Sequence, residues 1–148
     1  NDSDRLYGNS GNDYLSGGSG SDVLTGGTGR DRLSGGNGTD VFDFNFIGES
    51  GRTSTSRDVI TGFSAGFDDI DVRNIDASSL RAGNNRFVFI GSQEFERKAG
   101  QLRYERLNES GTSRDKTIVE GDVNGDGRAD FQIELTGLKS LTSSDFLL

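Results

Sequence analysis

Residues 17–43 read GGSGSDVLTGGTGRDRLSGGNGTDVFD, which is a single nine-residue unit written three times. Each unit has a glycine pair, a further glycine, an aspartate and, two residues after the aspartate, an apolar side chain. The unit fits the pattern G-G-x-G-x-D-x-U-x, in which U is apolar, and a fixed period of this kind indicates stacked repeats. The spacing extends towards the N-terminus, so that five aspartates lie nine residues apart: Asp4, Asp13, Asp22, Asp31 and Asp40.

The two parts of the unit favour different backbone structures. Repeated glycine gives the first six residues access to positive φ, so we expect a turn whose carbonyl oxygens point inward. The last three residues alternate outward and inward, which predicts a minimal strand. Two units then form one coil, and the coils stack about 4.8 Å apart as a right-handed parallel β-roll. The inward positions are Leu6, Leu15, Leu24, Leu33 and Phe42.

In such a roll, residues eighteen apart lie directly above one another, and the aspartates form columns. Two carboxylates about 4.8 Å apart would repel by roughly 3–4 kcal/mol at an effective dielectric of 20. A cation removes this repulsion, and oxygen ligands without His or Cys select Ca²⁺. We therefore expect at least three Ca²⁺ ions, held by aspartates and turn carbonyls of successive coils. The predicted metal positions in the repeats are Asp4, Asp13, Asp22, Asp31, Asp40, Asn9, Gly11, Gly18, Gly20, Gly27, Gly29, Gly36 and Gly38.

The composition supports a fold that depends on a cation. The chain has 148 residues, a hydrophobic fraction of 30 %, 23 glycines and a net charge of -8. The acidic charge makes nucleic acid an unsuitable partner. The absence of Cys and His excludes disulfides, thiolate metal sites and His-based catalysis. No apolar run approaches the ~20 residues of a membrane helix, and no N-terminal signal peptide is visible. We expect a monomer.

The repeats of residues 1–43 resemble the RTX repeats, the calcium-binding β-rolls of secreted bacterial proteins. The nine-residue period stops after residue 43, and we expect residues 44–148 to form an antiparallel β cap that completes one continuous domain. Strands are predicted at 57–63, 68–75, 86–91, 101–107, 117–123 and 129–135. The stretch DVITGFSAGFDDIDV, residues 58–72, is similar to the segment that closes the roll in this family. That resemblance implies that Asp58 and Asp68 complete calcium sites, although they would equally suit solvated strand ends.

The stretch DVNGDGRAD, Asp122 to Asp130, allows two interpretations. It begins like an EF-hand loop, but the position that requires a bidentate glutamate is Ile133. Asn-Gly and Asp-Gly are also strong turn signals, so a hairpin between two strands is the favoured reading. The same string resembles the C-terminal domain of serralysin-type secreted proteases.

The chain ends Asp145-Phe146-Leu147-Leu148, and an acidic residue before three hydrophobic ones resembles the C-terminus of type I secretion substrates. An ordinary terminal strand would have the same pattern. The resemblance implies a secreted, extracellular protein that meets the type I secretion machinery. In a cytosol with little free Ca²⁺ the stacked carboxylates would keep the segment unfolded, and extracellular Ca²⁺ would fold it.

The sequence predicts a module without catalytic activity of its own, because it lacks H-E-x-x-H, G-x-S-x-G and Walker motifs. RTX modules of this size resemble the R-modules of mannuronan C5-epimerases, which can bind alginate, and the folding and export domain of serralysin-type proteases. Thirteen of sixteen basic residues are Arg, and Arg matches carboxylates with two hydrogen bonds. We expect an alginate-binding surface, although solvated charges would explain the same residues. Its predicted members are Arg5 and Tyr7 on one sheet, Tyr14 and Arg32 on the other, and Arg30 in a turn nearby.

Overall fold

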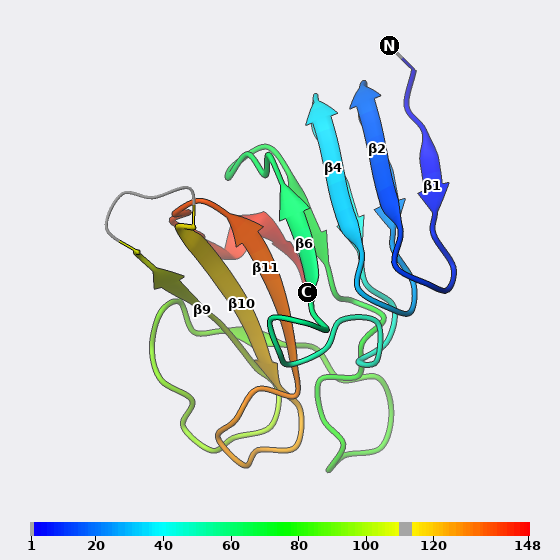
Figure 1. Ribbon diagram of the computed structural model, residues 1–148. Helices are drawn as coiled ribbons and strands as arrows, with labels where there is room; N and C mark the ends of the chain where they lie inside the picture. Colours follow the sequence, from blue (N-terminus) through cyan, green and yellow to red (C-terminus); the bar gives the residue numbers. More distant parts are fainter. Residues whose placement is uncertain (1, 110–113) are drawn as a thin grey trace.

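The computed structural model describes residues 2–109 and 114–148, and they form an all-β fold (Figure 1). Apart from one short 3-10 turn, η1 (Ser143–Asp145), every regular element in these residues is a β-strand. This confirms the predicted fold class. None of the helical segments found in the described residues has the length and apolar character needed to cross a membrane.

Successive strands of the repeats alternate between two sheets, which is the arrangement of a β-roll. All neighbours in the first sheet are parallel. Its strands, in order across the sheet, are β1 (Arg5–Tyr7), β3 (Val23–Thr25), β5 (Val41–Asp43), β7 (Asp69–Asp71) and β12 (Phe146–Leu147).

The second sheet has a parallel part and an antiparallel part. Its parallel part continues the roll, and its antiparallel part is made by long strands from the second half of the chain. The strands, in order across the sheet, are β2 (Tyr14–Ser19), β4 (Arg32–Asn37), β6 (Asp58–Thr61), β11 (Phe131–Thr136), β10 (Lys116–Asp122), β9 (Gln101–Leu107) and β8 (Val88–Phe89).

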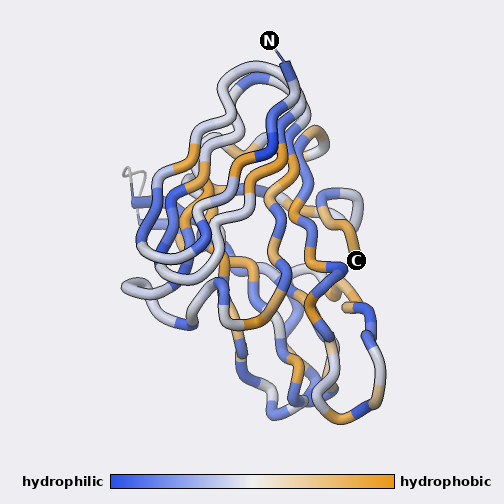
Figure 2. Tube along the Cα trace, turned by 90° about the vertical axis from the view of Figure 1, so that its right-hand side faces the viewer, coloured by the Kyte–Doolittle hydropathy of each residue, from blue (hydrophilic) through white to orange (hydrophobic). Residues whose placement is uncertain are grey.

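The register of the repeats is eighteen residues, as the spacing predicts. Leu6 lies beside Leu24 in the first sheet, and Leu15 lies beside Leu33 in the second. Each strand therefore places one apolar residue between the sheets. Figure 2 shows the coils stacked in the same orientation, with their hydrophobic segments in line.

The parallel stacking does not stop at residue 43, where the sequence analysis places the end of the roll. β6 pairs in parallel with β4, so that Ile60 lies beside Leu33, and β7 pairs in parallel with β5, so that Ile70 lies beside Phe42. β11 and β12 then add one further parallel strand to each sheet. Antiparallel pairing is confined to β11, β10 and β9. The nine-residue period is lost because loops lengthen the coils, while the inward apolar positions are kept.

The core continues from the roll into the antiparallel part without a break. Leu24, Leu33 and Phe42 are fully buried between the sheets, and Ile60 and Ile70 continue the two stripes. The antiparallel strands bury a second set of side chains against them, namely Leu102, Val119, Phe131, Ile133 and Leu135. The larger part of the apolar core therefore lies beyond the repeats, and each coil of the roll buries little.

Candidate metal centre

The aspartates of the repeats form two columns, one along each edge of the roll. Each aspartate immediately precedes a strand or begins it, so the strand register places the carboxylates above one another. Except in Asp4 and Asp13, which start the columns, the Oδ1 atom of each aspartate accepts a hydrogen bond from the backbone N–H of the aspartate one coil earlier. The donor and acceptor pairs are Asp4–Asp22 (2.8 Å), Asp22–Asp40 (2.9 Å) and Asp40–Asp68 (3.0 Å) in the first column, and Asp13–Asp31 (2.8 Å) and Asp31–Asp58 (2.8 Å) in the second.

The second oxygen of these carboxylates has no partner. In five aspartates the Oδ2 atom is buried and accepts no hydrogen bond: Asp13, Asp22, Asp31, Asp40 and Asp58. Buried polar atoms in native proteins almost always have a partner, and leaving one unpaired costs about 1–3 kcal/mol, more if it is charged. A repeated set of unpaired carboxylate oxygens is therefore suited to a cationic partner.

The first glycine of each pair faces the unpaired oxygen. A Cβ atom placed on Gly17 or Gly35 would overlap Oδ2 of Asp22 or Asp40, although both glycines have ordinary φ angles. The same holds for Gly26 against Asp31. These glycines are required for space and not for backbone conformation. The metal positions predicted from the sequence include the second glycine of each pair but not the first.

The turn residues predicted at metal positions have the expected left-handed backbone. A Cβ atom on Gly38 would overlap the carbonyl oxygen of Gly20 one coil earlier, so the turns stack in close contact. Carbonyl oxygens are thus layered along the same edges as the carboxylates. The predicted positions with positive φ are Asn9, Gly11, Gly18, Gly20, Gly27, Gly29, Gly36 and Gly38.

Three aspartates of the columns have raised pKa values. Burial raises the pKa of Asp31 and of Asp40, and the charges of neighbouring aspartates in each column raise it further, against the lowering effect of one backbone N–H. The pKa of Asp58 rises to about 8, mainly through burial and also through the charges of Asp31 and Glu49. Like charges held together in a buried site need a counter-charge in order to stay ionised at neutral pH.

Residues outside the repeats complete the ends of the columns. Asp68 ends the first column, and its Oδ2 accepts a hydrogen bond from the backbone N–H of Ser64 (2.8 Å). In the second column, Ser50 Oγ accepts the N–H of Asp58 (2.8 Å), and Glu49 is a buried carboxylate whose pKa is raised by burial. Both lie in the irregular segment 44–57, where no spacing signals them. In the described residues, no group of three or more His, Cys, Asp or Glu side chains lies close enough to hold a metal ion by side chains alone.

The stretch Asp122 to Asp130 is a hairpin loop between β10 and β11, as the turn signals favour. The two carboxylate oxygens of Asp122 accept the backbone N–H groups of Gly125 (2.6 Å) and Gly127 (2.8 Å). Asp130 accepts the N–H of Val123 and of Asn124. These acids therefore fold the loop through backbone amides and differ from the column aspartates.

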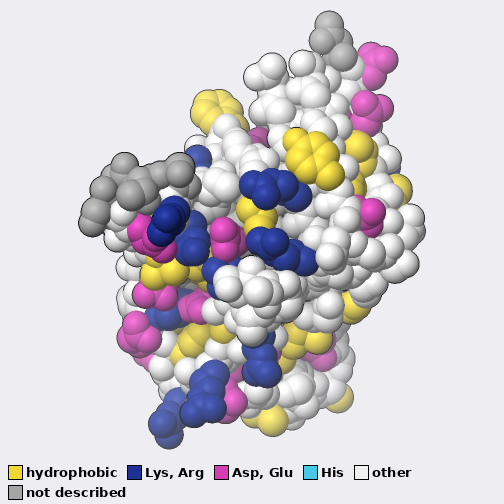
Figure 3. Space-filling model, viewed as in Figure 1, with side chains coloured by type: hydrophobic (Ala, Val, Ile, Leu, Met, Phe, Trp, Pro, Cys, Tyr) yellow, Lys and Arg dark blue, Asp and Glu magenta, His cyan; other side chains and the backbone are white. Residues whose placement is uncertain are grey.

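The predicted Arg and Tyr positions divide between the two sheets, as the alternation of the repeats predicts. Tyr14 and Arg32 are neighbours on the second sheet, and Tyr14 is 69 % exposed. Arg30 and Arg32 line a hollow of about 260 Å³ together with Lys116 and Glu134. Tyr7 and Tyr14 line another, open hollow of about 540 Å³. Figure 3 shows Lys and Arg side chains gathered over this face of the molecule. Arg5 and Tyr7 belong to β1 of the other sheet.

The C-terminal residues form a strand. Phe146 is buried and lies beside Ile70 in the first sheet, and Asp145 accepts the N–H of Gly66 (2.5 Å) and of Thr142 (2.6 Å). The apolar residues at the C-terminus thus form an ordinary strand at the edge of the first sheet.

Comparisons with known proteins agree with this architecture. Two solved structures are similar over 99 % of the chain. One is the AlgE6R2 subunit from the Azotobacter vinelandii mannuronan C5-epimerase, with 27 % identity, a TM-score of 0.64 and 88 % of that chain covered. The other is the AlgE6R3 subunit of the same enzyme, with 26 % identity, a TM-score of 0.63 and 78 % of that chain covered. Both are R subunits of an epimerase. No curated protein sequence gives a significant match.

A comparison with protein families matches residues 8–148 to the family described as peptidase M10 serralysin C terminal. The match includes four of the nonapeptides, the loop that follows them and both sheets to their last strands. The chain belongs to the serralysin C-terminal family of RTX-type repeat modules.

Proposed function

We propose that this chain is a non-catalytic, calcium-binding module of a secreted bacterial enzyme, and that it folds on Ca²⁺ after export. The observation that carries the proposal is the set of five buried Oδ2 atoms without a partner. In four of these aspartates, Asp22, Asp31, Asp40 and Asp58, the Oδ1 atom already accepts a backbone N–H. A cation would give the second oxygen the partner that the protein does not supply.

The residues of the columns suit Ca²⁺ in kind and in number. Carboxylate and carbonyl oxygens are the ligands of hard cations, and Ca²⁺ accepts six to eight of them in flexible arrangements. The two columns contain five gaps between successive aspartates. Aspartates on either side of a gap, with turn carbonyls of the same coils, would hold each ion. Bound Ca²⁺ would neutralise the column and join adjacent coils.

This arrangement links folding to location. Extracellular calcium modules bind at about 10⁻⁴–10⁻³ M, so a cytosol with much less free Ca²⁺ would leave the repeats unfolded. At about 2 mM Ca²⁺ and a Kd of about 0.1 mM, each site adds about 1.8 kcal/mol. Several sites together match the whole stability of a small domain.

Calcium titration followed by calorimetry and circular dichroism tests the proposal. We expect at least three equivalents of Ca²⁺ to bind and β-structure to appear in parallel with binding. The proposal would be contradicted if the chain were fully folded in excess EDTA and its stability did not change when Ca²⁺ was restored. Mg²⁺ at the same concentration is the control, because it is smaller and dehydrates reluctantly.

We further propose that the module helps a mannuronan C5-epimerase to hold its polyuronate substrate. This proposal is supported by the likeness to two R subunits of such an enzyme and by the exposed row of Tyr14 and Arg32 beside Arg30. An Arg guanidinium would bind the uronate carboxylate with two hydrogen bonds, and a Tyr ring would pack on a sugar face. The roll holds these side chains on adjacent strands, so little order is lost on binding.

An NMR titration of the calcium-loaded module with mannuronan oligomers tests the surface. We expect shifts at Tyr14, Arg30 and Arg32, and a loss of affinity of about tenfold in Tyr14→Ser, the cost of one stacked ring. Phe67→Ser, which removes another exposed aromatic ring, is the matched control. If Tyr7→Ser weakened binding and Tyr14→Ser did not, the groove would lie on the first sheet.

The second candidate is the C-terminal domain of a serralysin-like protease, with folding and export as its whole function. The family match over residues 8–148 favours it. It predicts the same calcium behaviour and no shifts with any uronate oligomer. The NMR titration therefore separates the two candidates on a folded domain.

A further inference from the structure

The antiparallel part of the molecule has a pocket that belongs neither to the aspartate columns nor to the Tyr14–Arg32 surface. Its volume is about 560 Å³, within the range of small-molecule sites. Residues 77–88 form one side, residues 97–100 form the other, and Gly125 of the hairpin loop closes it. Gly125 fits there because a Cβ atom would press on the backbone N of Ala99. We call it the cap pocket.

The lining of the cap pocket is basic although the chain is acidic. Four cationic residues line it, namely Arg81, Arg86, Arg97 and Lys98, and no Asp or Glu does. The net charge of the whole chain is -8. Such a local excess of positive charge would concentrate anions at this point of the surface.

The acidic residues nearest in sequence cancel only part of this charge. Asp76 uses one carboxylate oxygen to accept the backbone N–H groups of Ser78 (3.1 Å) and Asn85 (3.0 Å) and the Asn85 side chain (3.0 Å). Glu96 pairs with Lys98 at 2.7 Å. In the part of the chain that the structure describes, no ion pair joins Arg81, Arg86 or Arg97 to a carboxylate.

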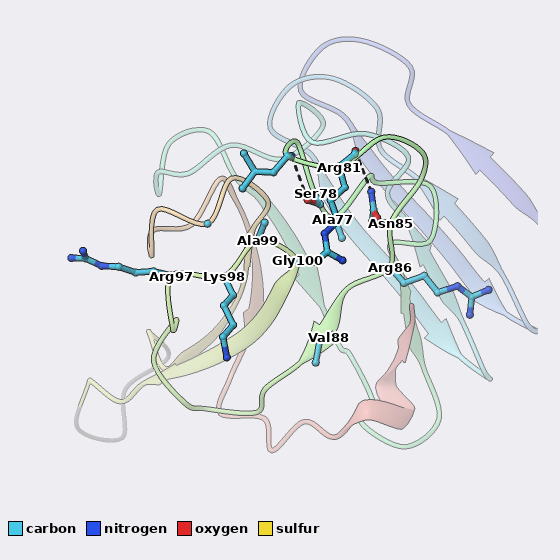
Figure 4. A pocket seen from close by; sticks show the side chains of 12 residues that line it. Ala77, Ser78, Arg81, Asn85, Arg86, Val88, Arg97, Lys98, Ala99 and Gly100 are labelled. Carbon is cyan, nitrogen blue, oxygen red and sulfur yellow. Dashed lines mark hydrogen bonds between the residues drawn. The ribbon is translucent and has the colours of Figure 1, made fainter.

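Arg81 is the basic side chain best placed to bind an anion. In Figure 4 its side chain lies in the middle of the labelled residues, whereas Arg86 and Arg97 extend outward on opposite sides. The turn that carries Arg81 is fixed by Asn85, whose side chain donates to the carbonyls of Arg81 (3.4 Å) and Gly83 (3.1 Å). A guanidinium on a fixed turn is preorganised for a bidentate oxyanion.

The pocket also has an apolar side. Leu80 is 71 % exposed and Val88 is 64 % exposed, and both line it. Exposed apolar side chains next to unpaired cations suit a molecule that combines an oxyanion with an apolar face. We propose that the cap pocket is an anion-binding site for a small molecule that carries a carboxylate or a sulfate group on such a body, with Arg81 as its main ligand.

An NMR titration of the calcium-loaded module tests this site with three matched probes: galacturonate, galactose 6-sulfate and galactose. The two acids distinguish the sources of the oxyanion, and galactose is the uncharged control. We expect saturable shifts at residues 78–81 and 98–100 with at least one acid and none with galactose. Arg81→Gln should weaken that binding at least tenfold, since it removes a charge-assisted bidentate contact. Arg52→Gln, outside the pocket, should leave it unchanged.

Two results would overturn the proposal. One is a folded module that shows no saturable shift at these residues with either acid up to about 50 mM. The other is equal affinity in Arg81→Gln and the parent. If Arg81→Gln alters the spectrum as a whole, the double variant Arg86→Gln/Lys98→Gln replaces it, with a weakening of at least threefold expected. The probes are single sugars, so this test does not depend on the polyuronate proposal.

Discussion

Replacing Asp31 by Asn separates the two roles of a column aspartate. Asp31 is 1 % exposed and lies between Asp13 and Asp58 in the second column. Its Oδ1 accepts the N–H of Asp13, and its Oδ2 has no partner. Asn has nearly the same shape and keeps the Oδ1 acceptor. The substitution therefore removes the charge and the second carboxylate oxygen while leaving the coil-to-coil hydrogen bond.

The expected effect of Asp31→Asn changes sign with Ca²⁺. Asp31 borders two gaps of its column, so two calcium sites are weakened. With about 1.8 kcal/mol per site at about 2 mM Ca²⁺, the free energy of unfolding should fall by about 3–4 kcal/mol. Without Ca²⁺ the variant should be more stable than the parent, because the charge that raises the energy of the buried column is gone.

Urea unfolding measures both arms of this prediction. One series uses 2 mM Ca²⁺, and the other uses EDTA with trimethylamine N-oxide, which favours the compact state. Calorimetry should show fewer calcium equivalents in Asp31→Asn. The control is Asp126→Asn, in the exposed hairpin loop, where one carboxylate oxygen accepts the N–H of Arg128. If Asp31→Asn lost the same stability in both solutions, the carboxylate would serve packing alone and the reasoning would be wrong.

Three further predictions concern pH, space and the hairpin. Burial raises the pKa of Asp58 to about 8, so the folded calcium-free state holds a proton that the unfolded chain releases above about pH 4. The free energy of unfolding in EDTA should therefore fall as the pH rises from about 4 to 8. If urea unfolding showed a rise over that range, the prediction would be wrong. Gly26→Ala should cost at least one calcium equivalent by calorimetry, because its Cβ would overlap Oδ2 of Asp31, whereas Gly48→Ala, with ordinary contacts, should cost none. Asp122→Ala should lower the free energy of unfolding by about 2 kcal/mol, because two hydrogen bonds to backbone amides are lost. The loss should be the same with Ca²⁺ and in EDTA. A loss that depends on Ca²⁺ would show a metal site in the loop.

The sequence predicted the roll well where period and spacing carry the information. An eighteen-residue register follows directly from the nine-residue spacing, and Leu15 does lie beside Leu33. The next coils have no such period, because 27 residues separate Asp31 from Asp58 and 28 separate Asp40 from Asp68. Their membership of the columns came from family resemblance alone. A longer loop in a coil costs little free energy, provided that the strand after it returns to the same register.

Other parts of the site depend on contacts that spacing does not encode. The first glycine of each pair is needed because of a side chain five residues later, as with Gly17 and Asp22. Ser50 reaches the second column from an irregular loop, and its Oγ also donates to the carbonyl of Gln132, 82 residues away.

The difference between the column aspartates and the other buried aspartates explains how one residue type serves two purposes in this fold. Asp122 is as buried as Asp22, but both of its oxygens accept backbone N–H groups supplied by a loop with positive φ. In the columns, parallel stacking supplies one N–H per coil, and Oδ1 takes it. The second oxygen can then find no donor in the roll, because each further coil brings one more carboxylate with each amide. A longer roll would repeat the deficit and never correct it. The unpaired oxygen is therefore a property of the repeat itself, whereas the antiparallel part supplies both oxygens of Asp122 with donors and carries most of the apolar core.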